Sequence, residues 1–171
     1  ILIMKSKITS VGLVVVLVSL FLFTSCKKTE TQEFNYSFNT GQLDASFAYG
    51  GTHSSTLSAK MTLEEIKDGG TLITIELSNT VSGEMYHLHA HDAADASTTP
   101  NGTPYNESPN TEVFTQMVTG NGGTVSVSQN TTTSFSDLTT TYEGFFVVHD
   151  PLQAISTVDP TTFVILGSFA R

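Results

Sequence analysis

The chain has few positive charges, a single cysteine and no tryptophan. Only seven of its 171 residues are Lys or Arg, against 16 Asp and Glu, and the formal net charge is −9 at pH 7. Because phosphate backbones attract proteins through Lys and Arg, this balance argues against nucleic acid as a partner. One cysteine excludes an internal disulfide. Charged residues make up 13% of the chain, where about a quarter is usual, and helical bundles and coiled coils are not favoured.

The first 25 residues have the features of a secretory signal peptide. Lys5 and Lys7 precede an apolar run over residues 11–23, which is too short to favour a stable membrane span. The segment Leu22-Phe23-Thr24-Ser25-Cys26 resembles a bacterial lipobox, in which the cysteine becomes the lipid-modified first residue of the mature protein. A plain transmembrane anchor and an unrelated buried cysteine are the alternatives.

The expected mature protein is a strongly acidic domain held at a membrane. Removal of residues 1–25 takes away Lys5 and Lys7 and no acid, so the net charge becomes −11. We expect lipidation at Cys26, a polar tether over residues 26–33 and one domain over residues 34–171. The predicted location is the bacterial cell envelope, on the periplasmic or the outer face.

The domain itself has the pattern of an all-β protein. Short segments of alternating polar and apolar residues are divided by turn residues, with Asp68-Gly69 as a hairpin signal. Eight or nine strands predict a β-sandwich or barrel. They are expected at residues 34–38, 43–47, 56–62, 71–77, 85–91, 112–118, 124–128, 144–149 and 162–169. Residues 63–67 could instead form a helical turn. Residues 93–110 are expected to form a long loop, either functional or disordered.

Three histidines alternate along one predicted strand. His87, His89 and His91 are spaced i, i+2, i+4, so a strand places their imidazoles on one face. The intervening residues, Tyr86, Leu88 and Ala90, are then expected to face the core. Imidazole is a preferred ligand of copper and zinc, and the row predicts a metal site. A surface row of uncharged histidines and a pH-sensitive surface are the alternatives.

Four further residues are considered for this site. His149 ends the apolar segment Gly144–His149, and a rigid strand can deliver it to the same metal. Asp92 and Asp150 follow expected ligands, where they can orient a ring or serve as ordinary turn residues. His53 lies among small residues and is expected to be an exposed loop residue rather than a ligand.

The order of these motifs resembles copper/zinc superoxide dismutase. Tyr86-His87-Leu88-His89 is similar to the H-x-H strand of that family, and Val147-Val148-His149 is similar to its V-V-H strand. A final strand containing Gly167 follows, and the resemblance covers residues 43–171. It implies a Greek-key β-sandwich of eight strands, with a copper site outside the barrel and under long loops.

The sequence lacks two features of that family, its zinc ligands and its Arg near copper. The loop segment Gly102–Asn106 contains no histidine where the family has zinc ligands, so the resemblance implies a copper-only site in which His91 replaces a missing ligand. The family attracts superoxide with an Arg near copper, whereas the only Arg here is the last residue, Arg171.

Two functional classes remain. The protein is either a copper-dependent superoxide dismutase or a module that binds copper, less favourably zinc, without turnover. Its expected partners are a membrane, a metal ion and a small oxidant. A rival resemblance is the CHRD domain, another extracytoplasmic β module with an H-x-H strand, although the chain lacks the G-E-x-R-G ending expected of that domain.

Overall fold

The computed structural model describes residues 29–67, 69–95, 97, 99 and 102–171. The expected signal peptide and Cys26 lie outside these residues. Within the described part of the chain, no helix is both long and apolar enough to cross a membrane.

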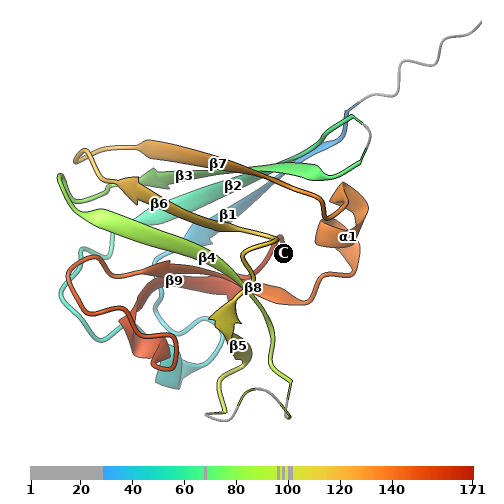
Figure 1. Cartoon of the computed structure of the whole chain (residues 1–171). Coiled ribbons are helices and arrows are strands. Elements are labelled where there is room, and N and C mark those ends of the chain that lie inside the picture. The colour runs from blue at the N-terminus through green and yellow to red at the C-terminus, as the bar shows by residue number, and fades with distance from the viewer. Residues whose placement is uncertain (1–28, 68, 96, 98, 100–101) are drawn as a thin grey trace, which may run out of the picture.

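Nine antiparallel strands form two sheets, which pack face to face (Figure 1). Sheet A has the order β1-β2-β3-β7, and sheet B has the order β5-β4-β8-β9 with β6 also paired to β4. The strands of sheet A are β1 (Thr31–Ser37), β2 (Ser58–Glu65), β3 (Thr71–Ser78) and β7 (Val125–Thr131). Those of sheet B are β4 (Met85–Ala93), β5 (Tyr105–Pro109), β6 (Thr115–Thr119), β8 (Gly144–His149) and β9 (Phe163–Ser168).

Alternation along each strand builds the core between the sheets. In β3, Ile73, Ile75 and Leu77 are fully buried, whereas Thr74 and Glu76 between them are partly exposed. Successive side chains of a strand point to opposite faces, so one face of sheet A packs against sheet B and the other faces water. The apolar pattern therefore fixes which face of each strand is inside.

The connections give the Greek-key arrangement. β4 pairs with β6, β6 contacts β7 where the two sheets meet, and β7 pairs with β3. The strands β4, β6 and β7 are neighbours in that order, and β3, which precedes them in the chain, lies beside β7. This spatial order, β3-β7-β6-β4, is that of a Greek key. The all-β sandwich prediction is confirmed: the described residues form nine strands in two separate sheets rather than a closed barrel.

Two local predictions are wrong. Residues 43–47 form no strand; Ala45–Phe47 is a single 3-10 turn. The side chain of Asp44 accepts a hydrogen bond from the Ser46 backbone N–H, and such local bonding competes with strand pairing. The alternative helical turn at residues 63–67 is also absent, because Leu63–Glu65 continues β2.

Two expected boundaries also move. β1 begins at Thr31, so three residues of the expected tether pair with β2. The expected loop 93–110 contains β5, which pairs with the end of β4. A six-residue helix, α1 (Phe135–Thr140), was not predicted; Ser134 caps its first turn by accepting from the Asp137 backbone N–H.

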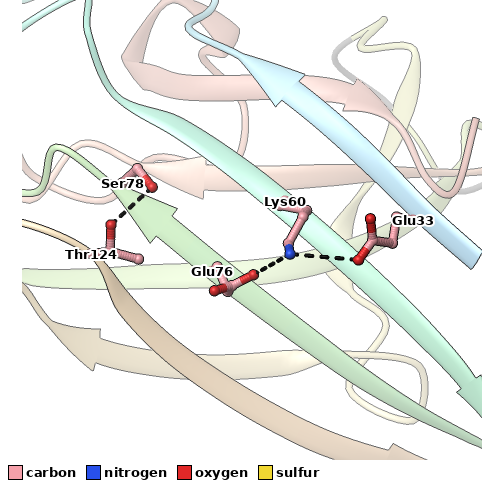
Figure 2. Close-up of polar contacts among 5 residues, drawn as sticks. All are labelled: Glu33, Lys60, Glu76, Ser78 and Thr124. Atoms are coloured by element: carbon pink, nitrogen blue, oxygen red, sulfur yellow. Dashed lines mark hydrogen bonds and ion pairs between the residues drawn. The ribbon is translucent and has the colours of Figure 1, made fainter.

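The outer faces of the two sheets differ in chemistry. On sheet A, Lys60 lies 2.6 Å from Glu76 and 3.5 Å from Glu33, and Ser78 is hydrogen-bonded to Thr124 (Figure 2). This face is polar and solvated. On sheet B, a second apolar cluster covers part of the outer face; its members are Tyr105, Val147, Phe163 and Leu166, with Phe47 and Phe145 at its edge.

Candidate metal centre

The histidines of β4 all lie on the outer face of sheet B. Tyr86, Leu88 and Ala90 are fully buried in the core between the sheets, as expected. His87, His89 and His91 alternate with them and therefore point the other way. The row becomes more buried along the strand: His87 and His89 are partly exposed and His91 is fully buried.

Strand β8 brings His149 to the same place. β8 pairs with β4 through Leu88 and Val148, and its pairing with β9 shifts register between Val148 and His149. Val147 belongs to the outer apolar cluster and Val148 to the core, so alternation along β8 directs His149 to the outer face. The His149 ring centroid lies 5.1 Å from that of His89, and the side chain is almost completely buried.

His89, His91 and His149 form a cluster in which one ring nitrogen of each lies within 4.8 Å of the others. We call these residues the histidine cluster. Metal–imidazole bonds are about 2 Å long, so two nitrogens that share an ion lie at most about 4 Å apart. Small movements of the side chains would therefore bring the three nitrogens onto one ion. The described residues place no thiolate or carboxylate within the cluster.

Four buried nitrogens of the cluster have no hydrogen-bond partner: Nδ1 of His89, Nε2 of His91 and both nitrogens of His149. In His91, the Nδ1–H donates to the carbonyl oxygen of Asn106 at 2.8 Å. This bond fixes the tautomer and leaves the lone pair on Nε2. Metal-binding histidines are oriented in this way by a partner on the second nitrogen.

The surroundings keep the imidazoles neutral. Burial, and after it the neighbouring histidines, lowers the pKa of His149 to about 3. Burial and the neighbouring His91 and His87 lower the pKa of His89 to about 4. The pKa of His91 is also lowered by burial, against the opposing effects of the Asn106 carbonyl and Asp92. Neutral imidazole is the form that binds metals.

Aromatic rings of the second apolar cluster enclose the histidine cluster. The Phe163 ring lies 4.9 Å from that of His149, and the Tyr105 ring lies 5.3 Å from that of His91, centroid to centroid. Val147 pairs with His89 and is fully buried. This cover limits the access of water to the three imidazoles.

His87 lies next to this cluster but outside it. Its ring centroid is 6.3 Å from that of His89, and it is not among the three residues whose nitrogens converge. The H-x-H pair that meets His149 is therefore His89-Ala90-His91, two residues later than the pair on which the family resemblance rests.

The two aspartates are bound elsewhere. Asp92 accepts hydrogen bonds from Asn110 and Tyr142. Asp150 accepts from the Tyr49 hydroxyl and from Gln153. The orienting role considered for these carboxylates belongs instead to the backbone carbonyl of Asn106, which no side-chain pattern could have indicated.

His53 is buried, and its expected exposure is wrong. Only 6% of the residue is exposed. Its Nδ1–H donates to the Ser54 carbonyl at 3.0 Å, and its Nε2 accepts from the Tyr86 hydroxyl at 2.7 Å. Both nitrogens are engaged, so His53 has a structural role on the other side of sheet B.

The chain matches no family model, and no curated protein or solved structure matches it significantly.

Proposed function

We propose that this protein binds a copper ion through His89, His91 and His149. The observation that carries the proposal is that three histidines from two strands each bring one ring nitrogen within 4.8 Å of the others. Four buried nitrogens of these rings have no hydrogen-bond partner. A buried polar group without a partner destabilises the folded state by about 1–3 kcal/mol. A bound metal ion removes this penalty from the nitrogens it ligates.

Copper is favoured over zinc by the donor set. All three ligands are neutral imidazoles, which suit both metals, and copper forms the more stable complexes with a given set of nitrogen ligands. Zinc remains an outcome of the test. Bound copper would supply a centre that can change its oxidation state, while Asn106 orients His91 and Phe163 and Tyr105 exclude water.

Spectroscopy of single variants tests this proposal. Cu(II) added to the metal-free protein is expected to give electron paramagnetic resonance with imidazole nitrogen couplings. His91→Ala and His149→Ala are each expected to weaken copper binding by about 100-fold or more, beyond what loss of a merely orienting group causes. His87→Ala is the comparison: it removes a histidine of the same strand whose ring is not part of the cluster, so it is expected to weaken Cu(II) binding much less than either cluster variant.

Two results would reject the copper assignment. If both cluster variants bound copper with wild-type affinity, these histidines would not be its ligands. If zinc displaced copper when the two metals compete for the site, zinc would be the bound metal.

Superoxide dismutation is the second candidate function. Three protein ligands leave a coordination position open, as in catalytic metal sites. Charge offers little support, because Arg171 hydrogen-bonds to the Thr140 carbonyl and Lys60 is paired with acids on sheet A. Copper-loaded protein that consumes superoxide no faster than its His149→Ala variant would leave copper binding as the function.

The proposal includes membrane attachment through a lipid on Cys26. β1 begins at Thr31, and five residues of extended chain span at most about 18 Å. Such a short connection would hold the sandwich near the bilayer. Cys26→Ser is expected to move the protein from the membrane fraction to the soluble fraction, and an unchanged distribution would contradict lipidation at this residue.

A further inference from the structure

Two exposed methionines flank His87 on the outer face of sheet B. Met85 is 49% exposed and Met117 is 57% exposed. The chain has four methionines; Met61 is fully buried in the core, and Met4 lies outside the described residues. Both exposed thioethers of the described chain therefore lie beside the one histidine of the β4 row that the histidine cluster leaves out.

The strand register brings these three side chains together. Met117 of β6 is directly opposite His87 of β4, and opposite residues of an antiparallel pair have Cβ atoms about 4.5–5.5 Å apart. Met85 is two residues before His87 on the same face and diagonal to Met117, a separation of about 7–8 Å that long side chains can span. Val118, next to Met117, packs against the core instead.

Two thioethers and one imidazole are a soft donor set. Thioether sulfur suits monovalent copper, whereas protein zinc sites are built from thiolate, imidazole and carboxylate and magnesium and calcium take oxygen ligands. The acidic balance of the chain, −9 overall, raises the local concentration of cations. The chemistry of this surface therefore fits Cu(I) better than any other common metal ion.

The position of His87 connects this surface to the buried site. Its ring lies 6.3 Å from that of His89, and the His89 ring lies 5.1 Å from that of His149. Along this row, the ligands change from exposed sulfur to partly exposed imidazole to buried imidazole. An ion can pass between neighbouring ligand sets over such distances by exchanging one ligand at a time.

We propose that Met85, His87 and Met117 form a second, exposed site that accepts Cu(I) and delivers it to the histidine cluster. We call these residues the methionine site. Transfer is a ligand exchange: the ion keeps its single positive charge, thioether bonds break as imidazole bonds form, and no electron or proton moves. The delivery step rests on the proposed function, whereas binding of Cu(I) at the methionine site does not.

The first experiment detects sulfur ligation directly. The full chain, with Cys26→Ser in every sample to remove the thiol, receives one equivalent of Cu(I) without oxygen. The same protein also carries His89→Ala and His149→Ala, which disable the histidine cluster. X-ray absorption at the copper edge is expected to show sulfur ligands, and these are expected to disappear when Met85→Leu and Met117→Leu are added. Both methionines are exposed and leucine has a similar volume, so the fold is retained, which circular dichroism verifies.

The second experiment measures delivery. With an intact histidine cluster, transfer of Cu(I) from a bicinchoninate complex is followed by the loss of the chelator's colour. Met85→Leu with Met117→Leu is expected to slow this transfer by about tenfold, the lower end of the effect of removing a supporting group from a metal site. Cu(II) affinity at equilibrium is expected to stay at the wild-type value, because the histidine cluster is unchanged.

The outcomes separate the two proposals. Absence of sulfur ligands in the first experiment overturns the methionine site, whatever the histidine cluster binds. Sulfur ligands with an unchanged transfer rate overturn the delivery role. Sulfur ligands in a protein whose histidine cluster binds no copper would support the methionine site and reject the proposed function.

Discussion

The imidazoles of the histidine cluster are neutral at pH 7 because burial makes their charged form unfavourable. The pKa of His149 is lowered to about 3 and that of His89 to about 4, from a usual 6.5. Between pH 6.5 and these lowered pKa values, the unfolded chain therefore binds more protons than the folded chain. Stability rises with pH wherever the unfolded state binds more protons, so the metal-free protein loses stability as pH falls below 6.5.

The first prediction concerns this loss. Unfolding of the metal-free protein in urea is expected to become easier from pH 6.5 down to about 4, by at most about 1.4 kcal/mol per pH unit for each histidine that titrates. The contribution of His89 is smaller because its side chain is partly exposed. His149→Gln is expected to make the pH dependence shallower, and an identical slope in this variant would contradict the lowered pKa of His149.

The second prediction concerns the structural histidine. The Tyr86 hydroxyl donates to His53 and accepts from the Val81 backbone N–H at 2.8 Å. Tyr86→Phe leaves both groups without this partner and is expected to lower the free energy of unfolding by about 1–3 kcal/mol. Copper affinity should not change, because Tyr86 points to the core. Full stability in urea would mean that other groups satisfy His53 and Val81.

At the scale of elements, alternation made the strands predictable. Core-facing residues such as Ile73 and Ile75 alternate with polar ones, and this pattern gave β3 and the outward direction of the β4 histidines. Residues 43–47 alternate equally well but form a 3-10 turn, because the Asp44 side chain supplies a local hydrogen bond. Periodicity alone cannot detect that competition.

The membership of the metal site was only partly predictable for the same reason. The sequence places His87, His89 and His91 on one face, but the pairing of β8 with β4 decides which of them meet His149. Tyr105 and the Asn106 carbonyl come from β5, and Phe163 comes from β9. Strand register, which is tertiary information, therefore selects the ligands.

The third prediction concerns the β2–β3 turn. Gly69 and Gly70 both have positive φ angles, 97° and 90°, which disfavour other residues. A Cβ at Gly70 would lie 2.5 Å from the Thr131 carbonyl oxygen, whereas nothing lies within 4 Å of one at Gly69. Gly70→Ala is expected to destabilise the fold by about 1–3 kcal/mol, and Gly69→Ala by less. Equal losses in thermal unfolding would contradict the close approach at Gly70.

At the scale of the whole molecule, the ligands join parts of sheet B that are distant in sequence. His89 and His91 belong to β4, and His149 ends β8, almost 60 residues later. The opposite face, on sheet A, carries the paired Lys60 and no member of the histidine cluster. A bound ion would therefore stabilise the fold by crosslinking one sheet, without contact with the other.

The fourth prediction follows from this crosslink. A ligand at 100 times its dissociation constant that binds only the folded state stabilises it by about 2.7 kcal/mol. Copper is expected to raise the midpoint of thermal unfolding of the wild-type chain as its concentration increases. The His149→Ala variant should show no such rise, and an equal rise in this variant would mean that copper binds elsewhere.

The most direct measurement is a crystal structure of the copper-loaded protein with an anomalous map at the copper absorption edge. We expect one strong peak on the outer face of sheet B, within bonding distance of ring nitrogens of His89, His91 and His149. A fully loaded crystal whose copper peak lies away from these three rings would contradict the proposed copper site.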